Sequence, residues 1–409
     1  MVDFSIIQEL VDAGNQSYYL INASRFRDNF IGLIEELNNI FPHFNIAYSY
    51  KTNYTPSLCK IVRDLGGYAE VVSSMEYRLA RKIGVSHEKI IFNGPYKERD
   101  FIYEVLTAGG SINIDNFREL NDINEHFRGY KPVNVALRCN YESCDGVLSR
   151  FGFDVESKEF LDSLKLIEDS PNLNLVGIHS HIANRGLDVW AGKVKGLCNI
   201  IEKHKLFELS FIDFGGGLYG GMPDELKKQF SSYIPNFKEY AQTIATPIKE
   251  LFSRNNIQSI PHLLIEPGSA VVGDAMDFIC TVDSIKNIRG HHIATVTGSM
   301  YNINPTLNHK NPPIHIIHRG QQPYSKINDC EKYDIAGYTC IESDYLYKGY
   351  QGHLEVGDII IFGNAGSYSI VLKPPFILPN FPIYQYDNGE VALVKEGEIF
   401  DDIFHTYKF

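Results

Sequence analysis

Residues 68–94 read YAEVVSSMEYRLARKIGVSHEKIIFNG, and this stretch decides the fold class. It begins with a short apolar run at 68–73, continues with apolar residues at helical spacing over 73–84, and returns to a second apolar run at 89–94. A strand, a helix and a second strand in this order predict a right-handed βαβ unit. The two strands of such a unit lie in one parallel sheet.

The same alternation of strands and helices extends from residue 25 to about residue 265. Eight strands are predicted there: FNIAYSY (44–50), YAEVVS (68–73), KIIFNG (89–94), SINID (111–115), VNVALRCN (133–140), LVGIHSH (175–181), LSFIDFG (209–215) and HLLIEP (262–267). Eight βα units close naturally into a barrel. We therefore expect an α/β fold with a (β/α)8 barrel domain that spans residues 25–267.

The sequence pattern of the rest of the chain is different. After residue 270, β-rich segments alternate with turns that are rich in Gly, Pro and Tyr. This pattern predicts a C-terminal antiparallel β domain of the sandwich or barrel-like kind. The segment SYYLIN (17–22) is too short to stand alone, so we expect it to complete this domain as a strand. The β domain would then comprise residues 1–24 and 268–409.

Composition limits the partners and the location. The chain has 409 residues and a formal charge of −12, and it contains no basic patch. This balance argues against nucleic acid or an anionic membrane as a partner. No stretch approaches the length of a membrane span, and residues 1–16 lack the features of a secretory signal, so we expect a cytoplasmic protein. The seven cysteines show no C-x-x-C spacing, which favours reduced thiols.

Polar side chains stand at the C-terminal ends of several predicted strands, where a (β/α)8 barrel places its active site. They are Lys51, Glu70, Arg138, His179, His181 and Glu266. Lys51 lies in AYSYKTN (47–53), and a lysine that is partly desolvated beside tyrosine rings can form a Schiff base. The commoner alternative for a single lysine is a solvated surface residue.

Three further motifs each allow two interpretations. DFGGGLYGG (213–221) places three glycines after a strand, where backbone N–H groups can bind a phosphate or where glycine simply permits a turn. In IEPGSA (265–270), the acid can be catalytic or can begin a turn. HSHIAN (179–184) puts two histidines on one face of a strand, which is a possible metal pair. Because no acidic or cysteine partner lies nearby in sequence, we expect no metal site and a structural role for His179.

Taken together, the motifs resemble the fold-type III, alanine-racemase-like decarboxylases that depend on pyridoxal 5'-phosphate (PLP), the group of diaminopimelate, ornithine and carboxynorspermidine decarboxylases. The matching motifs are YSYKTN, EVVSSMEY, SRFG (149–152), HSHIAN, FGGGLYGG, EPGSA, GYTCIESD (337–344) and NAGSYS (364–369), in that order. The resemblance runs over nearly the whole chain. It implies an enzyme that removes the α-carboxylate of an amino acid or an amino-acid-like conjugate and gives an amine and CO2.

The resemblance also implies roles for individual residues. Lys51 would hold PLP through a Schiff base, and His181 would stack on the pyridine ring. The residues expected to bind the cofactor phosphate or to shape its site are Asn184, Gly215, Gly216, Gly217, Gly268 and Tyr368. Glu266 would keep the pyridine nitrogen protonated, which makes the ring a strong electron sink. Racemases of the same fold carry an arginine at that place, so Glu266 favours decarboxylation over racemase or aldolase chemistry.

A second subunit is implied as well. Cys340 and Asp344 match the segment that this family inserts into the active site of the neighbouring subunit, where Cys340 would reprotonate the carbanion. Asp344 would pair with Arg150 across the interface, and Arg138 and Glu342 are further candidates for substrate or interface contacts. We therefore expect a homodimer with shared active sites.

The chain departs from the family pattern at three places. EPGS replaces EPGR, so that Ser269 stands in place of an arginine, and HIAN replaces HIGS. Ile341 follows Cys340 where an acid usually stands. Because isoleucine cannot bind an ammonium group, a simple diamine-forming substrate is less expected unless Glu342 turns inward, and a larger conjugate becomes reasonable. A non-catalytic relative remains an alternative, which the presence of Lys51 and the other cofactor residues disfavours.

Overall fold

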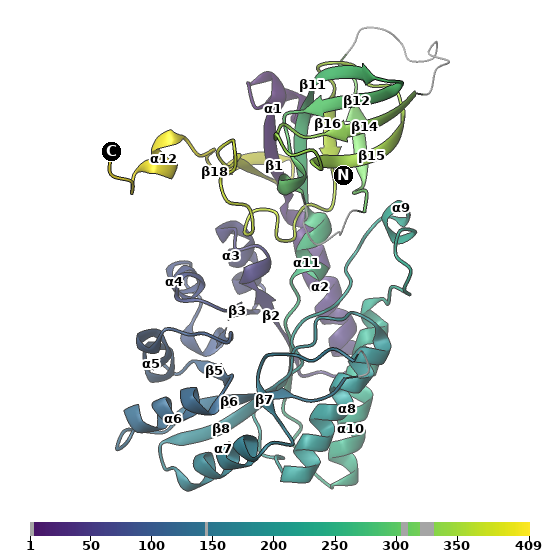
Figure 1. The fold of residues 1–409 in the computed structure, drawn as a ribbon. Coiled ribbons are helices and arrows are strands. Elements are labelled where there is room, and N and C mark those ends of the chain that lie inside the picture. The colour runs from purple at the N-terminus through teal and green to yellow at the C-terminus, as the bar shows by residue number, and fades with distance from the viewer. Residues whose placement is uncertain (1–3, 144–145, 304–309, 320–330) are drawn as a thin grey trace. The chain divides into compact units, whose positions relative to one another are not determined.

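The computed structural model describes residues 4–143, 146–303, 310–319 and 331–409 (Figure 1). The chain divides into two compact units. The barrel unit consists of Asn29–Gly220 and Ser232–Ala270, and the β unit consists of Met1–Asp28, Gly221–Ser231 and Val271–Phe409. The domain boundaries expected from the sequence, at residues 25 and 267, stay a prediction.

Eight parallel strands close the barrel in the order β2-β3-β4-β5-β6-β8-β9-β10, and β10 pairs with β2. The strands are β2 (Phe44–Ser49), β3 (Tyr68–Val71), β4 (Ile90–Phe92), β5 (Ser111–Ile114), β6 (Val133–Asn140), β8 (Leu173–His179), β9 (Phe211–Asp213) and β10 (His262–Ile265). A short strand, β7 (Phe153–Asp154), pairs with the end of β6. The predicted (β/α)8 barrel is confirmed.

Helices alternate with the barrel strands in sequence, beginning with α2 before β2. They are α2 (Ala23–Ile40), α3 (Pro56–Asp64), α4 (Ser74–Lys82), α5 (Arg99–Thr107), α6 (Phe117–His126), α7 (Lys158–Asp169), α8 (Leu187–His204) and α10 (Phe237–Arg254). Side-chain caps fix where several of them begin. Ser73 accepts the N–H of Glu76 at 3.2 Å, Asn116 accepts the N–H of Glu119 at 3.0 Å, and Asn236 forms a capping box with Glu239.

The β unit is built on a nine-stranded sheet, ordered β15-β14-β12-β11-β1-β17-β18, with β16 and β13 extending from β11. Its strands are β1 (Ser17–Asn22), β11 (Met276–Ile288), β12 (His291–Val296), β13 (Ile314–Ile317), β14 (Glu331–Ala336), β15 (Tyr345–Gly352), β16 (Ile359–Phe362), β17 (Ile383–Asp387) and β18 (Glu390–Lys395). Its helices are α1 (Phe4–Asp12), α9 (Asp224–Lys227), α11 (Ser269–Val272) and α12 (Phe400–Phe404), of which α11 begins in the barrel unit.

The first strand lies inside this sheet, as the sequence predicted. β1 pairs antiparallel with β11 on one side and parallel with β17 on the other, so segments from near the two ends of the chain are neighbours (Figure 1). Tyr18 and Leu20 of β1 pack into a core with Ile7, Ile279 and Ile359. The sheet is mostly antiparallel, and the parallel pairs β1–β17 and β12–β14 are a detail that the sequence did not predict.

The strand limits differ from the prediction near the glycines. The strand expected over 209–215 covers only Phe211–Asp213, because Gly215 adopts a left-handed φ of 62° that ends the extended backbone. Within the described residues, no helix is both long and apolar enough to cross a membrane.

Candidate active site

Lys51 lies in a short 3-10 turn, Tyr50–Thr52, directly after β2. Its side chain is 33% exposed, and its Nζ pairs with the fully buried carboxylate of Glu70 at the end of β3. The flanking residues Tyr48 and Tyr50 are both buried. Lys51 is therefore a half-buried lysine with a fixed acidic partner, which differs from the solvated lysine that was the alternative.

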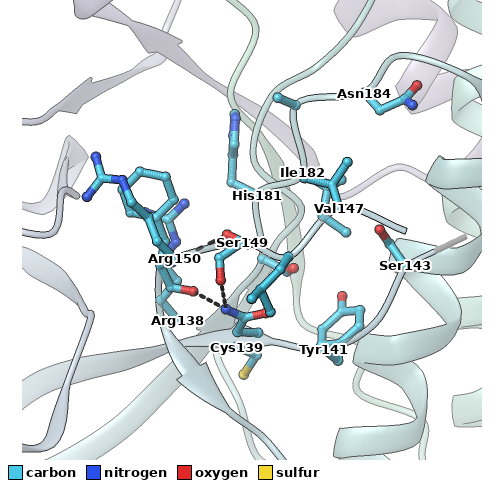
Figure 2. Close-up of a pocket in the computed structure, with 15 residues that line it drawn as sticks. Arg138, Cys139, Tyr141, Ser143, Val147, Ser149, Arg150, His181, Ile182 and Asn184 are labelled. Carbon is cyan, nitrogen blue, oxygen red and sulfur yellow. Dashed lines mark hydrogen bonds between the residues drawn. The ribbon is translucent and has the colours of Figure 1, made fainter. Parts of the chain in front are cut away.

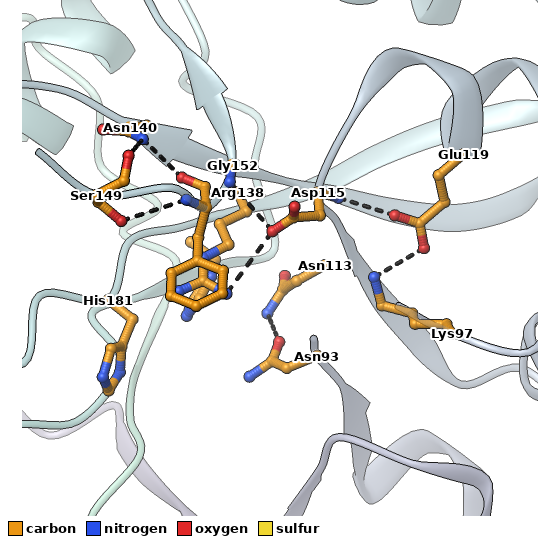
Figure 3. A network of polar contacts seen from close by, with 12 residues as sticks. Asn93, Lys97, Asn113, Asp115, Glu119, Arg138, Asn140, Ser149, Gly152 and His181 are labelled. Carbon is orange, nitrogen blue, oxygen red and sulfur yellow. Dashed lines mark hydrogen bonds and ion pairs between the residues drawn. The ribbon is translucent and has the colours of Figure 1, made fainter. Parts of the chain in front are cut away.

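An amide side chain links the lysine pair to the last strand of the barrel. Asn93, which follows β4, donates from Nδ2 to Glu70 Oε1 at 3.0 Å and to Glu266 Oε1 at 2.5 Å. Asn113 of β5 donates in turn to Asn93 Oδ1 at 2.7 Å (Figure 3). The side chains at the ends of these strands thus form one hydrogen-bonded row. Neither asparagine was predicted from the sequence, although Asn93 lies near the end of the predicted strand KIIFNG (89–94).

Glu266 sits at the centre of a buried polar cluster. Its Oε2 lies 3.6 Å from His179 Nε2 and 3.7 Å from His181 Nδ1. Although burial opposes ionisation, His179 and Lys51 hold the pKa of Glu266 well below its usual range. The side chain of Glu266 is 1% exposed. A negative charge is therefore fixed at the centre of the barrel mouth.

Asp213, at the end of β9, belongs to the same cluster but is protonated, whereas Glu266 is ionised. Burial, followed by the charge of Glu266, raises the pKa of the Asp213 carboxyl group well above its usual range. Ligand atoms of His179, Asp213 and Glu266 all lie within 4.8 Å of one another, so the acidic neighbours that the sequence argument did not find near His179 come from other strands. The pair divides one charge, with Glu266 ionised and Asp213 protonated.

His181 is held as a neutral ring. Its Nδ1 accepts a hydrogen bond of 2.9 Å from the N–H of Gly216, and burial lowers the pKa of His181 to about 4. The side chain is 28% exposed and borders a cavity (Figure 2). A neutral imidazole that is fixed by its Nδ1 suits stacking against a flat ring.

The three glycines do not offer three equivalent N–H groups. The N–H of Gly215 donates to Asp213 Oδ1 at 2.9 Å, and that of Gly216 donates to His181. A Cβ at Gly216 would lie 2.6 Å from the carbonyl oxygen of Glu266, which explains why glycine is needed there. Gly217 is the one of the three whose N–H has no acceptor within the described part of the chain. Any anion at this loop would therefore be bound from Gly217 onward.

Gly268 and Asn184 complete the predicted cofactor residues of the barrel unit. A Cβ at Gly268 would lie 2.0 Å from Thr52 Oγ1, so the EPGSA turn packs directly against the turn that carries Lys51. Asn184 lines the same cavity as His181, and its Oδ1 accepts the N–H of Gly186 at 3.0 Å.

A cavity of about 460 Å³ opens beside His181 (Figure 2). Arg138 and Arg150 line it, and their guanidinium carbons lie 4.6 Å and 4.1 Å from the ring centroid of Phe151. Among the described lining residues there is no carboxylate. The lining is therefore cationic and suits an anionic group.

A chain of buried charges positions Arg138. Lys97 Nζ donates to Glu119 Oε1 at 2.7 Å, and Glu119 Oε2 accepts the N–H of Asp115 at 2.9 Å (Figure 3). The Asp115 carboxylate lies 3.7 Å from Arg138 and accepts the N–H of Gly152 at 3.1 Å. One aspartate thus ties the arginine to the end of the SRFG segment. The sequence analysis did not find this network, since its members are far apart along the chain.

The remaining predicted site residues belong to the β unit. Cys340 is exposed, whereas the other described cysteines, Cys59, Cys139, Cys198 and Cys280, are buried free thiols. Glu342 is exposed, and Tyr368 has a left-handed φ of 64°. Cys144 and Cys330 lie outside the described residues. The roles expected of Cys340, Glu342 and Tyr368 stay predictions.

Asp344 is occupied within its own unit. It is 3% exposed, and its carboxylate accepts hydrogen bonds from Ser299 Oγ at 3.1 Å, Met300 N at 2.8 Å and Thr339 Oγ1 at 2.6 Å. These contacts fix the turn that presents Cys340. The expected ion pair with Arg150 stays a prediction, and it would have to compete with these donors and with the N–H of Thr339, which also donates to Asp344.

Known proteins with similar sequences are pyridoxal-dependent decarboxylases. The family described as pyridoxal-dependent decarboxylase, pyridoxal binding domain, matches residues 27–273. Diaminopimelate decarboxylase of Aquifex aeolicus is 27% identical over 97% of this chain and 93% of its own length. The enzyme of that name from Methanothermobacter thermautotrophicus is 26% identical over 97% and 92%.

Solved structures share the fold. The crystal structure of diaminopimelate decarboxylase from M. jannaschii superposes with a TM-score of 0.84 at 24% identity, covering 96% of this chain and 92% of the other. Diaminopimelate decarboxylase from Helicobacter pylori in complex with L-lysine superposes with a TM-score of 0.82 at 21% identity, covering 98% of each chain. The chain belongs to the pyridoxal-dependent decarboxylase family and is a PLP-dependent amino-acid decarboxylase.

Proposed function

We propose that this enzyme decarboxylates an amino acid whose side chain ends in a second carboxylate. The observation that carries the proposal is the cavity beside His181, which has Arg138 and Arg150 among its lining residues and no carboxylate among the described ones. Guanidinium groups bind carboxylates through paired charge-assisted hydrogen bonds. They would repel the distal ammonium group of lysine or ornithine.

The described residues fit the cofactor. The barrel mouth offers a half-buried lysine, a neutral imidazole, an ionised buried carboxylate and an N–H group of a glycine turn. We assign Lys51 to the aldehyde carbon, His181 to the ring face, Glu266 to the pyridine nitrogen and Gly217 to the phosphate. When bound, the cofactor supplies an electron sink for the electron pair that remains after CO2 leaves.

Side chains of the protein stabilise charge and accept protons near the cofactor site. The negative Glu266 would stabilise a proton on the pyridine nitrogen of the cofactor, and Asn93 orients Glu266 through its 2.5 Å hydrogen bond. Glu70 is bonded to Lys51 Nζ and is placed to accept a proton from it. Because Glu266 is an acid, neither a racemase nor an aldolase gains support from the site.

The relatives point to one substrate of the proposed class. Several of them carry the name diaminopimelate decarboxylase, and diaminopimelate has a distal carboxylate beside its distal amine. We propose it as the first substrate to test. Ile341 offers no charge to the distal amine, so we expect recognition to rest mainly on Arg138 and Arg150.

Release of CO2 from a panel of substrates tests the proposal. The panel comprises meso-diaminopimelate, L-glutamate, L-lysine, L-ornithine and carboxynorspermidine. We expect meso-diaminopimelate or another substrate with a distal carboxylate to give the highest kcat/KM. Highest activity on lysine or ornithine would contradict the proposed substrate class while leaving the reaction type intact.

A matched pair of arginine variants links the result to the cavity. Arg150→Gln should raise KM for the preferred substrate about tenfold or more, because a charge-assisted hydrogen bond is lost. Arg118→Gln, on the exposed side of α6, serves as the control and should leave KM unchanged. Equal KM values in the two variants would remove Arg150 from substrate recognition.

We also propose that the enzyme is a homodimer in which Cys340 enters the partner's site and returns a proton to the product carbanion. Two observations support this proposal. Cys340 is exposed, and the turn that carries it is stabilised by hydrogen bonds to the buried carboxylate of Asp344. The cytoplasmic location expected from the sequence is likewise a proposal.

A further inference from the structure

Lys193 is a fully buried lysine that the proposed reaction does not use. It lies on α8, is 0% exposed, and its Nζ donates to the carbonyl oxygen of Gly216 at 3.1 Å. The same Nζ lies 3.2 Å from the ring centroid of Trp190, one turn earlier on the helix. Burial lowers the pKa of Lys193 well below its usual range. Complete burial of a lysine is rare and costs stability, so the contact it makes calls for an explanation.

Trp190 makes the matching contact on the next peptide group. Its indole Nε1 donates to the carbonyl oxygen of Gly217 at 2.7 Å, and its side chain is fully buried. Two side chains of one helix therefore bind two successive carbonyl groups of the glycine turn. On the opposite side, a Cβ at Gly217 would lie 2.8 Å from the carbonyl oxygen of Ile182, so the turn is held closely from both directions.

Because peptide groups are planar, the hydrogen bonds from Lys193 and Trp190 also set the direction of the neighbouring N–H groups. In a trans peptide group the C=O and the following N–H point in opposite directions, and the described residues contain no cis peptide bond. Carbonyls that point toward α8 therefore direct the N–H groups of Gly217 and Leu218 away from α8. Neither N–H has an acceptor within the described part of the chain. Two successive N–H groups beside a left-handed residue form an anion-binding concavity.

We propose that Lys193 and Trp190 are positioning residues for the cofactor phosphate. By binding the carbonyl oxygens of Gly216 and Gly217 from α8, they fix the N–H groups of Gly217 and Leu218 in the orientation that receives the phosphate. Neither side chain contacts the phosphate itself. The inference rests on PLP as the cofactor and concerns only how its phosphate is held.

Comparing PLP with pyridoxal isolates the phosphate contribution. The full-length chain, freed of cofactor, is titrated with each aldehyde, and the ratio of the two dissociation constants is measured. Lys193→Met and Trp190→Phe should each lower the preference for PLP about tenfold, the size of one lost charge-assisted hydrogen bond. Their affinity for pyridoxal should stay within about twofold of the unmutated protein, as expected if only phosphate contacts are lost.

Lys195→Met is the matched control, because Lys195 lies two residues further along α8 but is exposed and makes no contact with the glycine turn. It should leave the preference for PLP unchanged even if it lowers thermal stability. If Lys193→Met fails to fold, Trp190→Phe keeps an aromatic ring in place and tests the second anchor alone. An unchanged preference in the folded variants, or a parallel loss of PLP and pyridoxal affinity, would overturn the inference. Failure of the unmutated protein to bind PLP would overturn the cofactor assignment and the inference with it.

Discussion

Glu266 and Asp213 show how one buried charge is divided between two neighbouring carboxyl groups. Burial alone would raise the pKa of both, but His179 and Lys51 lower the pKa of Glu266 and keep it ionised. Asp213 faces Glu266 and stays protonated. We therefore assign the electronic role to Glu266 and a structural role to Asp213, which accepts the N–H of Gly215.

This division predicts different effects for two isosteric substitutions. Glu266→Gln should lower the decarboxylation rate roughly a hundredfold, since a neutral amide cannot stabilise a proton on the pyridine nitrogen. PLP occupancy should change only a few-fold, because the contacts of Lys51 and of the phosphate turn remain. The measurement is single-turnover CO2 release beside cofactor absorbance.

Asp213→Asn is the control for that experiment. It replaces a carboxyl group that is already neutral and keeps the acceptor for Gly215, so the rate should fall much less than in Glu266→Gln. A larger rate loss in Asp213→Asn than in Glu266→Gln would show that the buried negative charge does not lie on Glu266. An equal loss of rate and occupancy in Glu266→Gln would show that Glu266 only helps to bind the cofactor.

The sequence could predict residues whose chemistry shows in a local motif, and it missed those that depend on three-dimensional neighbours. Lys51, His181 and Glu266 lie at the C-terminal ends of predicted strands, so the barrel rule and the family motifs pointed to them together. Lys193 lies in a helical pattern, where a lysine suggests a solvated face. A signal was present: Lys193 falls at helical spacing with the buried residues Trp190 and Leu197.

At the scale of elements, the first turn of α4 contains a buried acid with an unusual pKa. Glu76 Oε2 accepts the N–H of Val72 at 2.7 Å, and burial, despite this hydrogen bond, raises the pKa of Glu76 to about 7. The corresponding acid of α6, Glu119, accepts the N–H of Asp115 in the same way but also pairs with Lys97. At the start of α6 the charge of Glu119 is thus balanced by Lys97, whereas Glu76 at the start of α4 has no ion pair among the described residues.

The pH dependence follows from the sign of the shift. Because the folded pKa of Glu76 exceeds the usual value of 4.5, the folded state binds more protons between about pH 4.5 and pH 7. Glu76 therefore lowers stability progressively as the pH rises through that range. Glu76→Gln keeps an acceptor for Val72 and should raise the free energy of unfolding at pH 8 by at most about 3 kcal/mol. At pH 4 the two proteins should be nearly equal.

Thermal or denaturant unfolding at both pH values measures the difference. Glu119→Gln gives the contrast, because it leaves the buried Lys97 without its partner and should lower stability at pH 8. A stabilisation of Glu76→Gln that does not depend on pH, or a loss of stability at pH 8, would contradict the account.

Element boundaries were predictable where the sequence pattern changed sharply and less so at the glycines. The strand VNVALRCN was predicted over 133–140, which is the extent of β6. The strand expected over 209–215 was too long, since an apolar pattern does not reveal the left-handed φ of Gly215. The parallel pairing of β1 with β17 joins segments more than 350 residues apart, and no local pattern encodes it.

At the scale of the whole molecule, the proposed dimer predicts complementation between two inactive variants. Homodimers of Lys51→Ala and of Cys340→Ala should turn over poorly, because each variant damages both sites of its dimer. In a heterodimer, one composite site carries both changes and the other carries neither. Co-expression with random assembly should restore about a quarter of the sites by symmetry.

Differently tagged chains allow the mixed species to be isolated before CO2 release is measured. Isolated heterodimers that are no more active than the two parent variants would show that Cys340 acts within its own chain or has no catalytic role. Activity in the Cys340→Ala homodimer close to that of the unmutated enzyme would likewise remove the thiol from the mechanism.

We assign the covalent bond with the cofactor to Lys51 and not to the buried Lys193, and chemical reduction of the intact enzyme distinguishes the two lysines. Borohydride reduction of the PLP-loaded protein fixes the cofactor to the lysine nitrogen that carries it, and mass spectrometry of the peptides then locates the pyridoxyl group. We expect the group on the peptide that contains Lys51 and none on the peptide that contains Lys193. A pyridoxyl group on Lys193, or on any lysine other than Lys51, would contradict this assignment.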